Sequence, residues 1–280
     1  MNRVAVGLAV LCLFAVPVAA QQRPLVTEDP ETIGAGLILL EGGFDYSWDM
    51  VYPASGLTGN LLRLPLVGAS VGVSSIAEIQ IDTGFYNRLA IAKRVDAPLS
   101  GMLNFAGDRT SDFENIVVAT KVRVVGEGPR RPAIGFRFAT QLPTASNESG
   151  LGLDTTDFHF ALLVGKTVQS VRVVGNVGLG ILSDPTRGDR QNDVLLYGVS
   201  FARAMAEGVE LVGEVNGRLH TAAYDPPPGT ETRATMRIGA RYTAGPGRVD
   251  GGILLGMTSR DPSFGFMAGF TYVFNAFKVP

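Results

Sequence analysis

The feature that most constrains the fold is a regular alternation of large apolar with small or polar side chains, clearest near the end of the chain. In FGFMAGFTYVF, Phe264 to Phe274, five aromatic side chains and Ala268 share one parity, and Gly, Met, Thr and Val fill the other. Because successive side chains of a β-strand point to opposite faces, the pattern predicts a strand with one aromatic face. In water that face needs a protein core to cover it, whereas in a membrane lipid suffices.

The same alternation recurs along the chain. In GVELVGEVNGRLH, Gly208 to His220, apolar side chains occupy one face and charged or polar ones the other. Most of the segments are about ten residues or longer, which suits a tilted membrane strand better than a soluble strand of about 5–6 residues. Segment 61–74 alternates poorly, and Pro65 predicts a bulge or kink there. Twelve strands are predicted: 35–48, 61–74, 76–88, 114–125, 133–142, 156–167, 170–182, 193–206, 209–222, 231–244, 248–258 and 263–274.

The connections between these segments alternate between long and short. DMVYPASGLTGN, residues 89–113, PTASNESGLGLDT, SDPTRGDRQN, AAYDPPPGT and TSRDP alternate with tight links such as VQS and AEG. An antiparallel up-and-down transmembrane β-barrel of about 12 strands has this asymmetry, with short periplasmic turns and longer outer loops. A soluble all-β sandwich gives no reason for loop lengths to segregate, so the pattern favours the membrane barrel.

The front of the chain has the pattern of a cleavable signal peptide. Arg3 precedes an apolar run too short to span a bilayer, and Val18-Ala19-Ala20 offers small residues for cleavage. We therefore predict a leader at 1–20, an N-terminal periplasmic segment at 21–33 and a barrel over 34–280. The segment 21–33 either hangs in the periplasm or tucks into the barrel mouth.

Composition excludes several classes of function. The lone cysteine, Cys12, lies in the predicted leader, so the mature chain has no disulfide framework and no thiol chemistry. Without Arg3 the basic residues number 23 against 26 acids, a net charge of -3 with no basic cluster, which argues against nucleic acid as a partner.

The predicted outer face is apolar, and several of its aromatic residues fall near strand ends, at the level of lipid headgroups. The alternative is that these side chains fill a soluble core. The assigned outward residues are Ile38, Leu40, Phe44, Tyr46, Trp48, Val118, Val122, Phe136, Phe138, Phe158, Phe160, Leu162, Val173, Val177, Leu179, Met236, Ile238, Tyr242, Ile253, Leu255 and the terminal aromatics.

The predicted inner face carries charges of both signs. Each charge either belongs to a lattice of ion pairs that stiffens the interior or lines a solute path, and Glu210 and Glu214 are expected to face Arg233 or Arg237. About twelve strands enclose more than the filled eight-stranded barrel and less than an open porin, so a narrow or gated channel is expected. The candidate lumen residues are Glu41, Asp45, Arg63, Glu78, Asp82, Lys121, Arg123, Arg137, Asp157, His159, Arg172, Glu210, Glu214, Arg218, Arg233, Arg237 and Arg241.

Signals for catalysis or cofactor binding are weak. The two histidines, His159 and His220, lie on the lumen face without a local motif, and the chain has no GxSxG, HExxH, P-loop or Rossmann fingerprint. The acidic stretches TEDPE, SDPTRGD and TSRDP are better explained as solvated loop tips than as divalent-cation sites. We predict no catalytic residue, no metal and no cofactor.

Two segments resemble a known family. RPLVTEDPETIGAGLILLEGGFDY and FATQLPTASNESGLGLDTTDFHFALLVGKT are similar to outer-membrane β-barrels described as transporters of the phenol-degradation (meta-cleavage) pathway. The resemblance implies a barrel in a Gram-negative outer membrane that takes up small hydrophobic or aromatic compounds. It supplies no residue roles that can be transferred to this chain.

The sequence thus predicts a passive, porin-like channel gated chiefly by residues 89–113, with a further contribution from the N-terminal segment. Two alternatives stay open: a structural or adhesive barrel with a plugged lumen, and a lumen enzyme using His159 or His220. The expected partners are the lipid bilayer, a small-molecule solute and the barrel-insertion machinery, and no oligomeric interface is legible.

Overall fold

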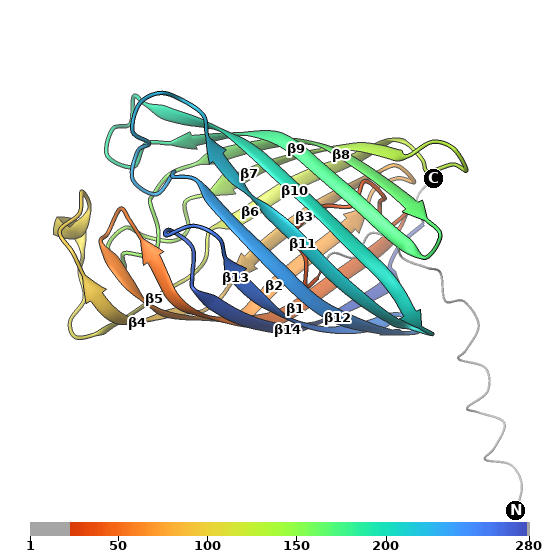
Figure 1. The fold of residues 1–280 in the computed structure, drawn as a ribbon, viewed down its shortest axis with the longest axis horizontal. Coiled ribbons are helices and arrows are strands. Elements are labelled where there is room, and N and C mark those ends of the chain that lie inside the picture. The colour runs from red at the N-terminus through yellow and green to blue at the C-terminus, as the bar shows by residue number, and fades with distance from the viewer. Residues whose placement is uncertain (1–22, 279–280) are drawn as a thin grey trace, which may run out of the picture.

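The chain folds into one closed antiparallel β-barrel of twelve strands. The structure, a computed structural model, describes residues 23–278, so the predicted leader lies outside the described residues. β1 pairs with both β2 and β14, which closes the sheet on itself (Figure 1). The strand segments are β1 Leu37–Tyr52, β2 Leu57–Gly72, β3 Ala77–Gly84, β4 Asn87–Arg94, β5 Arg109–Asp112, β6 Ile116–Val125, β7 Ala133–Leu142, β8 Asp157–Val168, β9 Val171–Ser183, β10 Gln191–Ala206, β11 Val209–His220, β12 Arg233–Ala244, β13 Gly247–Gly256 and β14 Phe264–Asn275.

Two of the twelve barrel strands are interrupted, which explains why there are fourteen segments. β3 and β4 form one strand broken at Phe85-Tyr86, and β5 and β6 form one strand broken at 113–115. On the C-terminal side of Leu64-Pro65, β2 pairs with β3, and on the N-terminal side it pairs with β4. The irregularity predicted at Pro65 is therefore confirmed.

The aromatic face that the sequence predicted points away from the barrel. Phe264, Phe266, Phe270 and Tyr272 are exposed, whereas Met267 and the other residues of opposite parity in β14 are mostly buried. All strands of residues 23–278 belong to one sheet, so no second sheet formed by these residues covers the rings. The soluble-core alternative is wrong, and the apolar exterior is the lipid-facing surface of a transmembrane barrel.

The connections segregate by end as predicted, except that the expected long outer loop DMVYPASGLTGN is wrong: β1 continues to Tyr52 and β2 begins at Leu57, so only the short turn 53–56 connects them. Tight turns, at 73–76, 169–170, 207–208 and 245–246, lie at the same end as the C-terminus, with the longer 126–132 turn beside them (Figure 1). The opposite, extracellular end carries 95–108, 143–156, 184–190 and 221–232. Among residues 23–278, no helix is both long and apolar enough to cross a membrane.

The predicted outer loop 89–113 is wrong in its bounds. β4 continues to Arg94 and β5 begins at Arg109, so only 95–108 connects them, with a short 3-10 turn at Ser100–Met102. At the breaks in β3–β4 and β5–β6 the inward parity slips by one residue. The alternation in the sequence that predicts a strand is therefore interrupted at each break, although the backbone pairing resumes beyond it.

Candidate functional site: a lumen crossed by the N-terminal segment

The N-terminal segment lies inside the barrel. We call residues 23–33 the strap; it contains most of the TEDPETIG motif and precedes β1. Of the two placements left open from sequence, the strap adopts the one in the barrel, near the periplasmic end (Figure 1). Because an extended chain leaves its N–H and C=O groups unpaired, its position depends on partners supplied by the barrel wall.

Wall side chains bind the backbone of the strap. The N–H groups of Val26 and Thr27 donate to the carboxylate of Glu214 on β11, at 2.8–3.1 Å. Asn176 on β9 accepts from the Glu28 N–H at 2.7 Å and donates to the Glu28 carbonyl at 2.8 Å. The Ile33 N–H donates to Glu78 on β3 at 2.7 Å. These bonds fix the path of the strap across strands far apart around the barrel.

Each acidic side chain of the strap meets a cation of the wall. The Glu28 carboxylate lies 2.9 Å from Arg137 and 3.4 Å from Lys121. Asp29 accepts two hydrogen bonds from Arg172, at 2.6 and 2.8 Å, in the bidentate geometry that favours arginine.

Glu31 pairs with Arg123, which also donates to the Ser75 carbonyl. The acidic stretch TEDPE is thus a set of ion-pair partners for β6, β7 and β9, and not a solvated loop tip.

Arg23 anchors the start of the strap against β13 and β14. Its guanidinium donates to the Ala268 carbonyl at 3.0 Å and lies 3.5 Å from Asp250. Glycines make this approach possible, because a Cβ on Gly43 would lie 2.3 Å from Nη2 of Arg23, and one on Gly269 would lie 2.5 Å from it. The strap therefore contacts the wall from β13–β14 round to β3.

Lys121 on β6 is fully buried at this level, with 0% of its side chain exposed. Its ammonium lies 3.0 Å from Glu78 and 3.4 Å from Glu28, so one carboxylate comes from the wall and one from the strap. A buried ammonium is tolerated only with such compensation. The strap is therefore part of the charge balance of the interior.

At the periplasmic rim, Glu127 in the 126–132 turn joins the strap region to the β8–β9 turn. It accepts from the Thr167 N–H at 2.7 Å, from Lys166 at 3.0 Å and from Arg172 at 2.6 Å. Partial burial of the Glu127 carboxyl raises its pKa. The hydrogen bonds and the charge of Arg172 outweigh burial, so the pKa lies below its ordinary value.

A cavity of about 410 Å³ lies against the strap inside the barrel. Residues of the strap, Arg23 to Val26 and Glu28, form part of its boundary. Charged groups share its wall with the apolar residues Leu66, Val67 and Met267. Its volume falls within the range of small-molecule sites, about 300–1,000 Å³, so it is large enough for a compact solute with both polar and apolar parts.

The charges around this cavity are unevenly paired. Arg63 is held by Asp45 and lies 2.8 Å from Glu114. Glu41 and Asp82 face the space over Gly68, where a Cβ would lie 2.6 Å from Asp82 Oδ1 and 3.5 Å from Glu41 Oε2. Within the described part of the chain, the carboxylate of Glu41 accepts a single hydrogen bond, at 3.3 Å from Thr271. The cavity therefore presents carboxylates that are less fully engaged than those on the strap.

An apolar cluster lies towards the extracellular end of the barrel. We call the outer lid the buried cluster of Leu57, Leu61 and Leu89 with its partly buried neighbours Met50, Tyr52, Ile91, Leu103, Phe105 and Leu151. Leu103 and Phe105 come from 95–108, and Leu151 from 143–156. The two loops are joined by the Asn104 N–H donating to the Glu148 carbonyl at 2.9 Å.

The architecture is similar to that of known outer-membrane proteins. The COG4313 outer membrane channel from Pseudomonas putida F1 has a TM-score of 0.62 at 12% identity, with 88% of this chain and 98% of that chain covered. The toluene transporter TbuX from Ralstonia pickettii has a TM-score of 0.44 at 10% identity, covering 87% and 90%. At 12% identity, the likeness to the COG4313 channel concerns the fold alone. No family model matches the sequence, and no curated protein matches it.

The candidate lumen residues predicted from sequence lie on the inner side. Glu214 pairs with Arg237 at 2.7 Å as expected, whereas Glu210 lies opposite Arg241 and binds it at 2.8 Å. Arg233, offered as a partner of these acids, instead donates to the Val51 carbonyl. Most of these charges carry an acid, base or carbonyl partner, which favours the lattice interpretation for the individual residue.

The two histidines have different surroundings. His159 lines the cavity. The ring nitrogens of His220 lie 2.7 Å from Asn192 Oδ1 and 2.7 Å from the Tyr224 carbonyl, so its hydrogen bonds are local. Within residues 23–278, no group of three His, Cys, Asp or Glu side chains is placed to hold a metal ion.

Sequence reasoning missed the roles of Arg23, Glu28, Asp29 and Glu31. A signal was present, because the acidic TEDPE stretch could have been matched to cations on the predicted inner faces of 114–125, 133–142 and 170–182. It was not decisive, since acidic residues after a leader are equally compatible with a solvated segment. The outer lid was missed because its leucines lie beside parity slips: Leu57 and Leu61 precede the slip at Leu64-Pro65, and Leu89 follows the one at Phe85-Tyr86.

Proposed function

We propose that the protein is an outer-membrane channel through which small, hydrophobic or aromatic compounds diffuse passively. The observation that carries the proposal is a cavity of about 410 Å³ beside the strap, inside a barrel with a lipid-facing exterior. The similarity in fold to an outer membrane channel supports the channel role. The apolar lid and the resemblance to phenol-pathway barrels support the solute class.

In this proposal, a solute enters through the apolar side chains of the lid, occupies the cavity and leaves past the strap. Leu103 and Phe105 offer apolar contacts near the outside, and the cavity offers polar partners for a hydroxyl or carboxyl group. No energy source or cofactor is invoked, since the concentration gradient drives the flux. The strap must shift for passage, because it lies across the periplasmic side of the cavity.

The test is solute flux into liposomes that contain the refolded barrel. Phenol-sized aromatic compounds are compared with sugars of similar mass, using the intact chain and a variant lacking residues 23–33. Aromatic solutes are expected to enter faster than the sugars, and deletion of the strap should raise the flux of both. A heat-dependent shift in gel mobility confirms that each variant is a folded barrel.

One observation favours a second candidate, a structural or adhesive barrel with a plugged lumen. Every acidic side chain of the strap is engaged by a cation, as expected for a permanent plug. The absence of flux for all solutes, in both the intact chain and the strap deletion, would support this candidate and contradict the channel.

A further inference from the structure

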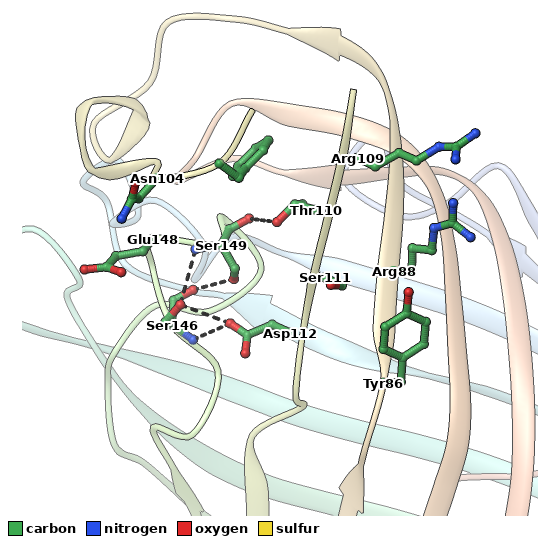
Figure 2. A pocket seen from close by; sticks show the side chains of 11 residues that line it. Tyr86, Arg88, Asn104, Arg109, Thr110, Ser111, Asp112, Ser146, Glu148 and Ser149 are labelled. Carbon is green, nitrogen blue, oxygen red and sulfur yellow. Dashed lines mark hydrogen bonds between the residues drawn. The ribbon is translucent and has the colours of Figure 1, made fainter. Parts of the chain in front are cut away.

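A second hollow, of about 680 Å³, lies at the extracellular end, around the short strand β5. Figure 2 shows Arg88, Arg109, Ser111 and Tyr86 on one side of β5, and Asp112 with Ser146 on the other. It is distinct from the cavity beside the strap, with which it shares no lining residue.

Arg88 and Arg109 face outward from the barrel. Their chain neighbours Leu89 and Thr110 are buried on the inner side, and alternate residues of a strand point to opposite faces. Arg88 is registered with Ser111, and Arg109 with Ala90, on adjacent positions of the β4–β5 pair. The two guanidinium groups therefore extend from neighbouring positions of one outer surface, as Figure 2 shows.

Neither arginine has an ion-pair or hydrogen-bond partner among residues 23–278. This differs from the interior, where Arg63, Arg137 and Arg172 each bind a carboxylate. The nearby acid Asp112 is engaged on the other side of β5, where it accepts from the N–H and hydroxyl of Ser146 at 2.8 and 3.0 Å. Two adjacent free guanidinium groups attract an anion from outside the chain.

The position of the arginines relative to the lipid identifies the source of that anion. Phe85, Tyr86 and Phe113 are 51%, 45% and 55% exposed, and the rings of Phe85 and Phe113 lie 6.4 Å apart. Such exposed rings mark the headgroup level. Arg88 follows Tyr86 by two residues, a rise of about 7 Å along a strand. The guanidinium groups therefore lie beside the headgroups of the outer leaflet.

We propose that Arg88 and Arg109 bind the phosphate of a phosphorylated lipid headgroup in the outer leaflet, as carried by lipid A. Guanidinium groups match phosphate oxygens in a bidentate manner, and the hydroxyls of Tyr86 and Ser111 lie on the same side. β5 pairs only with β4, so its other edge also offers N–H groups that no strand occupies. The proposal depends on the membrane placement of the barrel and not on transport.

The test measures lipid A retained by the purified barrel, by native mass spectrometry after exchange into mixed micelles. The double variant Arg88→Gln, Arg109→Gln is compared with Arg203→Gln, an exposed outward arginine near the opposite end of the barrel. We expect bisphosphorylated lipid A to bind the intact chain and Arg203→Gln alike. The double variant should lose affinity by about tenfold or more, because two charge-assisted contacts are removed.

Two further measurements distinguish a phosphorylated lipid from other ligands. Dephosphorylated lipid A should bind all three proteins as weakly as the double variant binds the phosphorylated form, and millimolar inorganic phosphate should not displace the lipid. Equal binding of lipid A by the double variant, or equal binding of the dephosphorylated lipid, would overturn the proposal. So would complete displacement by inorganic phosphate. Gel mobility of unheated samples confirms folding, and unchanged flux separates this result from the proposed channel function.

Discussion

The two ends of the interior are packed by opposite kinds of chemistry. At the periplasmic end, the strap is held by ion pairs and backbone hydrogen bonds, each to a particular side chain of the wall. At the extracellular end, the outer lid is a cluster of leucines and aromatic residues with few directional bonds. Directional contacts fix one geometry, whereas apolar contacts tolerate rearrangement. We therefore expect the lid to open more readily than the strap moves.

The largest expected effect on stability comes from removing the buried ammonium group of Lys121, which lies beside the strap. Lys121→Met leaves Glu78 and Glu28 without their shared cation, and breaking a buried pair in this way costs about 3–5 kcal/mol. The free energy of unfolding, measured by urea titration in lipid vesicles, should fall by that amount. Lys93→Met, at an exposed lysine near the end of β4, is the control and should change little. A loss equal to that of the control would contradict the pairing described for Lys121.

The lid should respond as an apolar core does. Leu89 is 0% exposed, so Leu89→Ala should lower the free energy of unfolding by about 2–5 kcal/mol and leave a cavity. Leu219→Ala removes the same atoms from a side chain that is 42% exposed on the lipid-facing surface, and should cost less. Flux of aromatic solutes should also rise in Leu89→Ala alone. Equal losses of stability in the two variants would show that the lid is not a packed cluster.

The strap can be tested by charge reversal at its Glu31–Arg123 pair. Glu31→Arg and Arg123→Glu each place like charges together, so each should loosen the strap and increase ionic conductance in planar bilayers. The double variant restores opposite charges and should return the conductance toward that of the intact chain, with an interaction energy of about 0.5–3 kcal/mol. Additive effects of the two changes would mean that the pair does not hold the strap.

The smallest effect is expected at Glu127 on the periplasmic rim. Because its folded-state pKa lies below the ordinary value of 4.5, its contribution to stability is present above that value and is lost as the pH falls through the lowered pKa. Unfolding titrations of the intact chain should therefore show a loss below pH 4.5 that Glu127→Gln reduces. Glu207→Gln, in the 207–208 turn, should leave the pH profile unchanged. An identical profile for all three proteins would contradict the bonding described for Glu127.

The same comparison explains how much the sequence could predict. The barrel was predictable because lipid outside and a polar interior impose a period of two on every regular strand, as in β14. The period slips near Leu64-Pro65, Phe85-Tyr86 and 113–115, so β5, most of β4 and the part of the lid between Leu89 and Phe105 were hidden within a predicted loop.

The strap was harder to predict for another reason. Its partners are distant in sequence: Glu28 and Lys121 are 93 residues apart, and Asp29 and Arg172 are 143 apart. The alternation of side chains within a strand cannot predict a pairing between residues so far apart in sequence. The inward parity of 114–125, 133–142 and 170–182 showed which cations the lumen holds, but not that the N-terminal segment neutralises several of them.

The most direct test of the account is a disulfide between the strap and β10. A Cβ on Gly198 would lie 3.5 Å from the Cβ of Thr27, within disulfide range, and the chain's only cysteine, Cys12, lies in the predicted leader. In the variant Thr27→Cys, Gly198→Cys, we predict that the bond forms in the folded barrel without added oxidant. Solute flux should then stay low until a reductant is added. Two free thiols in the folded barrel, open to bulky reagents, would contradict a strap inside the lumen.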